Sequence, residues 1–151
     1  MRVWSLSTAR TWNVIGHTRL ITSVGFTGDG KHITSTSHHD SIRVWSIFGK
    51  HQQVFNTPGP AAVSKDGQHI AFCVDDRTLR VRSVFGGHER NFHSDSDIRF
   101  VEFSDDGQWI KFGGWSYRTI LSINTGEKAE SNTIAFNNRV RTRLIYKSGN
   151  D

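Results

Sequence analysis

The sequence predicts an all-β fold built from repeated units, and three observations support this. Glycine and tryptophan are common and proline is scarce, with 14 Gly, 5 Trp and 2 Pro in 151 residues, a composition that favours short strands and tight turns. A motif recurs with little change, as RVWSL at 2–6, RVWSI at 43–47 and RVRSV at 80–84. Asp-Gly pairs recur at intervals of 37 and 40 residues, at Asp29-Gly30, Asp66-Gly67 and Asp106-Gly107. A period near 40 residues is typical of propeller blades.

Each period has the pattern of four short strands. In the clearest copy, residues 21–27, 31–37 and 41–45 are rich in β-branched or alternating apolar residues, and 52–55 provide a fourth strand. The turns between them contain Gly28–Gly30 and His38–Asp40, residue types that accept turn conformations. Four antiparallel strands joined by tight turns make one blade, so the predicted fold is a β-propeller of four-stranded antiparallel blades.

The blades do not complete a ring within this chain. We expect a half-blade at 1–15, blades at about 16–56, 57–94 and 95–134, and a basic C-terminal tail at 135–151. This gives about 3.5 blades, whereas propellers usually have about 4–8 and closure removes the open strand edges. The sequence is expected to be part of a longer propeller, or to close by self-association. A closed four-blade monomer would need two inner strands from the tail, which offers one at 139–146. The isolated chain is therefore predicted to self-associate or aggregate.

Residues 16–45 resemble a WD40 repeat. They contain Gly16-His17, then Ile21-x-Ser23-Val24-x-Phe26-x-x-Asp29-Gly30, and end in Ser41-Ile42-Arg43-Val44-Trp45. The resemblance extends over about residues 1–127, is specific in this repeat and is weaker in the next two. It implies a propeller that serves as a protein-interaction scaffold and is not an enzyme.

The resemblance also implies a hydrogen-bonded tetrad of His, Asp, Ser or Thr, and Trp that stiffens a blade. The first repeat offers His17, Ser35 and Trp45, while the Asp position falls by spacing on His39, with Asp40 beside it. Departures are frequent in the other repeats: the residue after the family's Trp is Ser5, Ser46 and Ser83 where the family has Asp, and Arg82 replaces the second Trp. These departures predict incomplete tetrads and marginal blades, since a buried polar network stabilises only when all its members are satisfied.

No combination of residues nominates a catalytic or metal site. His38-His39-Asp40 is the best metal candidate, but adjacent residues of a strand point to opposite faces, and solvated turn histidines are the favoured interpretation. Cys73 lies in an apolar strand and is expected to pack in the core. The pairs Asp75-Asp76 and Asp105-Asp106 are interpreted as turn formers. We therefore expect no enzyme activity, no cofactor and no metal.

Partner binding is predicted at one end of the blades. In the family, partners often dock on the face that carries the loop into the first strand and the turn between the second and third strands. The corresponding turns here supply the candidate partner-binding residues His38, His39, Asp40, Asp75, Asp76, Arg77, Trp115, Tyr117 and Arg118. Aromatic residues dominate interface hot spots, although Trp115 packing between blades is an equally good interpretation.

The net positive charge is also compatible with nucleic acid as a partner. The net charge is +5, and alternating Arg139, Arg141 and Arg143 would line one face of a strand and meet phosphates, so nucleic-acid binding through the tail and blade rims is the alternative function. No apolar run is long enough for a membrane helix and no signal-peptide core is present at the N-terminus. One cysteine fits a reducing compartment, and the predicted location is cytoplasmic or nuclear.

Overall fold

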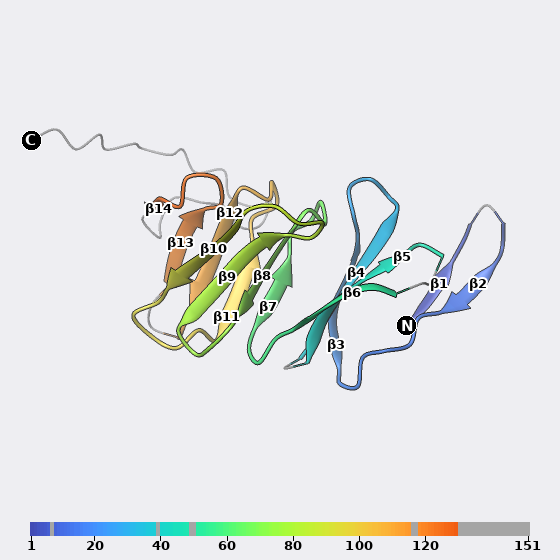
Figure 1. Ribbon diagram of the computed structural model, residues 1–151, viewed down its shortest axis with the longest axis horizontal. Coiled ribbons are helices and arrows are strands. Elements are labelled where there is room, and N and C mark those ends of the chain that lie inside the picture. Colours follow the sequence, from blue (N-terminus) through green and yellow to red (C-terminus); the bar gives the residue numbers. More distant parts are fainter. Residues whose placement is uncertain (7, 39, 49–50, 116–117, 130–151) are drawn as a thin grey trace, which may run out of the picture.

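The described part of the chain is built from β-strands alone. A computed structural model describes residues 1–129 apart from 7, 39, 49–50 and 116–117, and within these residues fourteen strands form four antiparallel sheets without a helix (Figure 1). The strands are β1 (Arg2–Trp4), β2 (Thr11–Asn13), β3 (Ile21–Phe26), β4 (His32–Ser37), β5 (Ser41–Ser46), β6 (His51–Asn56), β7 (Ala61–Val63), β8 (His69–Cys73), β9 (Thr78–Ser83), β10 (Glu89–His93), β11 (Phe100–Phe103), β12 (Trp109–Gly113), β13 (Arg118–Ser122) and β14 (Lys128–Ala129).

The four sheets are one half-blade and three complete blades. β1 and β2 pair alone and form the half-blade, whereas β3–β6, β7–β10 and β11–β14 form four-stranded sheets in sequence order, here called blades 1, 2 and 3. Figure 1 shows them following one another in a row, with β1–β2 at one end and β11–β14 at the other. The predicted fold class, an incomplete β-propeller of four-stranded antiparallel blades, is confirmed. The blade boundaries drawn from the sequence stay predictions, and the tail at 135–151 lies outside the described residues.

Each blade repeats one hydrogen-bonded turn between its first and second strands. In blade 1 the buried Thr27 hydroxyl donates to Asp29 Oδ1 at 2.5 Å and accepts from the His32 amide at 3.1 Å. Ser64 with Asp66 and Ser104 with Asp106 make the same bonds in blades 2 and 3. The glycine that follows each Asp has a positive φ, of 67°, 69° and 69° at Gly30, Gly67 and Gly107, a conformation that favours glycine. This explains why Asp-Gly is the most regular landmark of the sequence.

The core is divided into layers between adjacent sheets. Ile42 and Val44 of blade 1 pack against Ile70 and Phe72 of blade 2. A larger cluster joins blade 2 to blade 3 and contains Ala71, Cys73, Leu79, Val81, Ile98, Phe103, Ile110, Phe112 and Leu121. On the other side of blade 1, Val3 and Val14 of the half-blade cover Ile33 and Trp45. Burying these alternating apolar faces is the main stabilising contribution to the stack.

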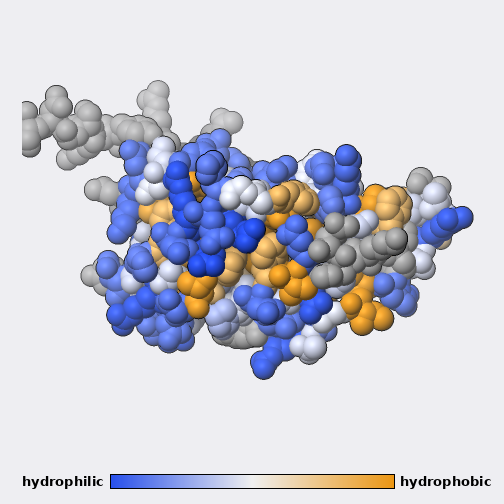
Figure 2. All heavy atoms as spheres, in the orientation of Figure 1, coloured by the Kyte–Doolittle hydropathy of each residue, from blue (hydrophilic) through white to orange (hydrophobic). Residues whose placement is uncertain are grey.

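Apolar residues also remain at the surface. The most exposed large ones are Leu6, Trp115, Ile15, Leu20, Phe48, Trp4, Phe26 and Val24. Figure 2 shows apolar residues between polar ones on the visible face, including the end that carries the half-blade. Among the described residues, no helix has the length and apolar character to cross a membrane.

Candidate functional site: the upper face

The predicted docking turns all lie at one end of the blades. Antiparallel pairing places the β4–β5, β8–β9 and β12–β13 turns at the same end as the loops that enter β3, β7 and β11. We call this end the upper face. The Asp-Gly turns lie at the opposite end. The upper face therefore carries the candidate partner-binding residues that the structure describes, whereas His39 and Tyr117 lie outside the described residues.

A pocket of about 330 Å³, here called the central pocket, opens on the upper face across all three blades. Each blade and the loops between blades contribute to its lining. Blade 1 provides Thr22, Ser37 and His38, blade 2 provides Ala61 and Asp76, blade 3 provides Phe100 and Val101, and the loops that enter blades 2 and 3 provide Pro58, Gly59, Pro60, Ile98 and Arg99. Two predicted residues from different blades, His38 and Asp76, thus line one cavity. Its volume lies within the range of ligand pockets in proteins.

A second pocket of about 400 Å³, here called the rim pocket, adjoins the first through Arg99. It is lined by Arg77, Asp95, Ser96, Asp97, Arg99, Gly114 and Trp115. The Asp97 carboxylate links both guanidinium groups, with Oδ1 3.3 Å from Arg77 Nε and Oδ2 3.1 Å from Arg99 Nη2. Trp115 is 90% exposed, so it does not pack between the described blades.

Two other candidate partner-binding residues, Asp75 and Arg118, contact nearby groups of the chain itself. Asp75 accepts a hydrogen bond from the Arg77 amide at 2.9 Å, and this bond, with others from Thr78, lowers the pKa of its carboxyl group. The Arg118 guanidinium lies 5.8 Å from the centre of the Phe100 ring, in cation–π range. Asp75 therefore shapes its own turn, as expected of the Asp75-Asp76 pair, while Arg118 borders the central pocket through Phe100.

In blade 1 the four tetrad candidates form one network at the edge of the upper face. His17 Nε2 is 2.7 Å from the Ser35 hydroxyl, which also accepts a hydrogen bond from Trp45 Nε1 at 2.8 Å. On its other side His17 Nδ1 is 3.2 Å from Asp40 Oδ2. The expectation of an incomplete tetrad is therefore wrong for this blade. The Asp member is Asp40, one residue beyond the spacing-derived position, because the turn after Ser37 places this carboxylate beside His17.

Gly16 makes this network possible. A Cβ atom at residue 16 would lie 2.8 Å from Trp45 Cη2, closer than side-chain atoms approach one another. The glycine lets the chain pass beside the indole ring and deliver His17 to Ser35. The Gly-His pair is therefore a packing requirement of blade 1.

Blades 2 and 3 replace the network with aromatic packing. Phe72 and Phe112 occupy the positions five residues after Gly67 and Gly107 that correspond to Ser35 in blade 1, and both are buried. Arg82, at the position of Trp45, lies 5.2 Å from the centre of the Phe55 ring and pairs with Glu89 at 3.5 Å. Where blades 2 and 3 lack tetrad residues, buried aromatic rings and, in blade 2, an arginine contact take their place.

Cys73 lies directly behind the central pocket. A Cβ atom on Gly59, which lines the pocket, would be 3.1 Å from Cys73 Cβ. Burial, with added repulsion from the charges of Asp75 and Asp76, raises the pKa of the thiol to about 12. The thiol is protonated at neutral pH and is a poor nucleophile. Among the described residues, no group of three or more His, Cys, Asp or Glu side chains is placed to hold a metal ion.

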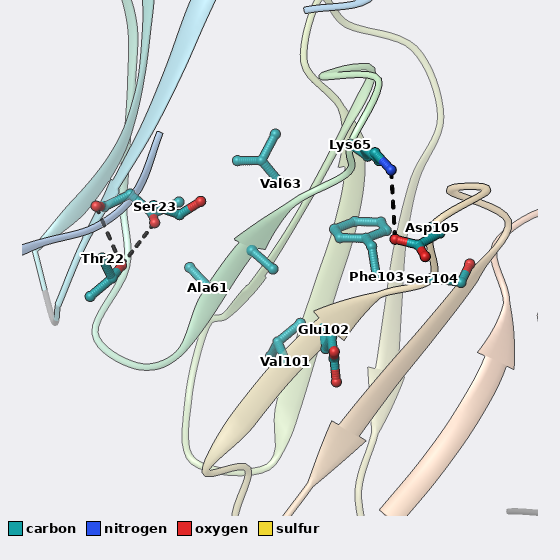
Figure 3. Close-up of a pocket in the computed structure, with 12 residues that line it drawn as sticks. Thr22, Ser23, Ala61, Val63, Lys65, Val101, Glu102, Phe103, Ser104 and Asp105 are labelled. Carbon is teal, nitrogen blue, oxygen red and sulfur yellow. Dashed lines mark hydrogen bonds and ion pairs between the residues drawn. The ribbon is translucent and has the colours of Figure 1, made fainter. Parts of the chain in front are cut away.

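A third concave region lies along the first strands of the three blades, and several of its polar groups are paired with one another or with neighbouring side chains. Figure 3 shows Lys65 pointing to Asp105, whose atoms are 3.8 Å apart, on the side formed by β3, β7 and β11. Glu102 pairs with Lys111 at 2.7 Å, and the Thr22 hydroxyl is 2.9 Å from that of Thr36. The upper face carries the predicted docking turns, two adjoining pockets and the exposed Trp115, and is the better candidate site.

Sequence reasoning missed several residues of the upper face. Arg99 joins the two pockets, and the loop Pro58–Pro60 lines the central one. The signal was present, because Thr57-Pro58-Gly59 and Ser94-Asp95 stand where the first repeat has Gly16-His17. These loops enter the first strands of blades 2 and 3, and therefore lie beside the predicted turns.

Comparisons with known proteins agree with this architecture. Residues 7–46 match the family model described as WD domain, G-beta repeat. No curated protein matches the chain. Among solved structures, "Structure of U3-55K" is similar with a TM-score of 0.59 and 18% identity, covering 78% of this chain and 40% of that chain. "Crystal structure of RRP9 WD40 repeats" has a TM-score of 0.60 and 17% identity, covering 78% and 39%.

Fold and repeats define the chain as a propeller-type repeat protein. Residues 7–46 carry a WD40 repeat, and the described chain has the fold of an incomplete WD40 β-propeller, which confirms the resemblance inferred from the sequence. The chain spans about two fifths of the length of the solved structures that it matches. WD40 propellers generally act as protein-interaction scaffolds and are typically not enzymes.

Proposed function

We propose that this chain docks a segment of another protein on its upper face. The observation that carries the proposal is the junction of the central and rim pockets at Arg99, next to a Trp115 side chain that is 90% exposed. Large exposed aromatic residues beside arginine are characteristic of interface hot spots. Loops from three blades contribute, so a short extended segment can contact several of them at once.

The proposal is supported by the way the blades present these loops. Each loop is anchored to a strand buried in the layers between blades, which makes the platform rigid while the loop residues set specificity. The proposed docking function involves neither catalysis nor a cofactor. A cytoplasmic or nuclear location stays a prediction.

Selection of peptides from a displayed random library against the full chain tests the proposal. The selected peptides are then titrated against Trp115→Ala, which is expected to weaken binding by about tenfold or more, as for an aromatic hot spot. Phe48→Ala is the matched control, because Phe48 is also a large aromatic, is 75% exposed and lies in a turn at the opposite end. Its removal should leave binding unchanged.

Stability must be measured on the same variants. Trp115→Ala should keep the free energy of urea unfolding of the parent chain, since an exposed side chain contributes little to it. Equal loss of binding in the two variants, or failure of any peptide to depend on Trp115, would contradict docking on the upper face.

A further inference from the structure

The exposed apolar surface of this protein is concentrated at the end that carries the half-blade. Of the ten large apolar side chains that are exposed among the described residues, eight belong to the half-blade, to blade 1 or to the loop between them. Two of the eight, Val24 and Phe26, lie on one face of β3 and are 51% and 60% exposed. Apolar residues gathered in this way mark interaction surfaces.

The next repeat shows what covers the same place when it is filled. Ala61 and Val63 of β7 stand one repeat after Val24 and Phe26 in the sequence. They are partly buried, because blade 1 packs against them and its second strand, β4, contacts β7. In blade 1, β4 pairs with β5, and the equivalent of β5 in the half-blade is β1, which shares its RVWS sequence. A strand placed beside β1 would therefore cover Val24 and Phe26.

β1 has a free edge for such a strand. The Val14 amide donates to the Met1 carbonyl at 2.8 Å, and the Ser5 amide donates to the Arg10 carbonyl at 2.9 Å. Backbone groups alternate sides along a strand, so those of Arg2 and Trp4 point away from β2. Among the described residues, no strand pairs with that side of β1. An extended peptide can add to such an edge, where main-chain hydrogen bonds give affinity and alternate side chains give specificity.

The charge of this end selects the chemistry of the peptide. The described charged residues of the half-blade and blade 1 are Arg2, Arg10, Arg19, Lys31, Arg43, Asp29 and Asp40. Five of these seven are basic, and both carboxylates accept hydrogen bonds within blade 1, Asp29 from Thr27 and Asp40 from the Thr18 amide. The surface potential therefore favours an acidic segment.

Blade 1 also supplies the register of the added strand. Arg43 and Trp45 of β5 are the equivalents of Arg2 and Trp4, and a residue of β4 lies directly opposite each of them. In an added strand, the residues opposite Arg2 and Trp4 would project away from blade 1. The residues between and beside them would project toward β3. An acidic residue opposite Arg2 would form a cross-strand ion pair.

We propose that the free edge of β1 and the Val24–Phe26 face of β3, together called the strand site, bind an acidic extended segment of another protein. Every second residue of that segment is apolar and covers Val24 and Phe26, and a Glu or Asp lies opposite Arg2. The strand site is separate from the upper face and adds a second docking surface to the function proposed above.

Fluorescence anisotropy of labelled peptides with the full 151-residue chain tests this. The probe has the core Val-Thr-Val-Glu-Val, with two aspartates on each side and a neutral dye. In the register of β4, its Thr lies opposite Trp4 and its Glu opposite Arg2. It should bind about tenfold more tightly than a peptide of the same composition with the three valines adjacent. It should bind about fivefold more tightly than a peptide with Lys in place of Glu.

Methylation of single peptide amides tests main-chain pairing without altering the protein. The Thr and Glu amides of the probe point toward β1 in this register, so a methyl group on either should weaken binding about tenfold or more. The amide of the central valine points away from β1. Its methylation is the matched control and should have a much smaller effect.

Protein variants locate the binding. Phe26→Ala should weaken the probe about tenfold, as for an aromatic residue at an interface. Trp115→Ala is the matched control, because Trp115 is also an exposed aromatic but lies on the upper face of blade 3. Arg2→Gln should weaken the probe about threefold and leave a probe with Gln in place of Glu unchanged. Thermal unfolding of each variant checks that the fold is retained.

Several results would overturn the strand site. Equal binding of the rearranged peptide, or equal effects of the methyl groups, would show adhesion without strand pairing. Self-association that depends on Phe26, with no binding of the probe, would assign the area to a second copy. Sedimentation with phosphatidylserine vesicles that depends on Phe26, with no binding of the probe, would assign it to a membrane. Loss of Trp115-dependent binding contradicts only docking on the upper face, so the two proposals fail separately.

Discussion

At the scale of single residues, the Ser35 hydroxyl holds the blade 1 network together. It contacts both His17 Nε2, at 2.7 Å, and Trp45 Nε1, at 2.8 Å. Ser35→Ala would leave two buried nitrogens without their partner, and we expect a loss of about 1–3 kcal/mol in the free energy of unfolding. Urea denaturation measures it.

Ser37→Ala is a matched control for that experiment. Both serines are buried residues of β4, but the Ser37 hydroxyl has no partner among the described residues. Its removal should leave the free energy of unfolding within about 0.5 kcal/mol of the parent. Equal effects of the two substitutions would show that the Ser35 bonds add nothing.

Asp40 makes the same network sensitive to acid. Burial raises the pKa of its carboxyl group, but hydrogen bonds from His17 and the Thr18 amide, with the charges of His17 and Arg43, outweigh burial and bring the pKa below its ordinary value of 3.8. A lowered folded-state pKa stabilises the fold above pH 3.8, and this contribution is lost as the pH falls through the folded-state pKa.

We therefore expect the unfolding free energy of Asp40→Asn to fall less steeply than that of the parent chain below about pH 4. Thermal unfolding from pH 7 to pH 2.5 measures the difference. Parallel pH profiles of the two proteins would rule out an Asp40 contribution. Asp95→Asn provides a control for loss of one exposed carboxylate.

Residue types and their spacing identified the blade 1 network more readily than the pockets of the upper face. His17, Ser35 and Trp45 were accessible from spacing, because each has a fixed place in the repeat. Asp40 was displaced by one residue, since turn geometry decides which neighbour reaches His17. Which residues line the two pockets depends on what the neighbouring blades leave uncovered, and no local pattern carries that information.

At the scale of elements, the Asp-Gly turns provide a paired test of backbone strain and packing. Gly30 and Gly67 have φ values of 67° and 69° in equivalent turns. A Cβ at Gly30 meets no atom within 4 Å, whereas one at Gly67 would meet the Thr27 side chain of blade 1 at 2.7 Å. Gly30→Ala should cost only the backbone term, about 1–2 kcal/mol.

Gly67→Ala should cost about 1–3 kcal/mol more, because it adds a collision between two blades to the same backbone strain. Urea unfolding of both variants gives the difference directly. A smaller loss for Gly67→Ala than for Gly30→Ala would mean that the contact between the two turns is absent in solution.

Strand patterns were predictable because alternation and Asp-Gly turns are local. Four strands per period followed from residues 21–55, and the same count holds in all three blades. What replaced the tetrad in blade 2 was not predictable, because the contact between Arg82 and Phe55 joins two blades. The sequence showed a missing Trp, and the structure shows a guanidinium over an aromatic ring.

At the scale of the whole molecule, the half-blade covers only part of the apolar side of blade 1 that faces it. Phe26 pairs with Ile33 and Val24 with Ser35 across β3 and β4, so all four project from the same face. The half-blade buries Ile33 but leaves Phe26 60% and Val24 51% exposed. In blade 2 the corresponding residues Ala61 and Val63 pack against blade 1.

This uncovered area predicts self-association of the isolated chain. Phe26 and Val24 lie beside the half-blade, and exposed apolar area next to open strand edges promotes pairing. Substituting both by Lys should shift the mass measured by light scattering after size exclusion toward the monomer. Substituting Phe48 by Lys, at an exposed turn, should not. A parent chain that is monomeric at micromolar concentration would overturn the prediction.

The layered core limits how far a local loss of packing spreads through the molecule. Each cluster of buried apolar residues joins only two adjacent sheets, so a substitution in one layer reaches a distant blade only by loosening the one between them. Blades 1 and 2 each contribute to two clusters and couple their neighbours. Blade 1 therefore separates the half-blade from the pocket walls that blades 2 and 3 provide. The half-blade can diverge in sequence while the part of the upper face on blades 2 and 3 keeps its shape.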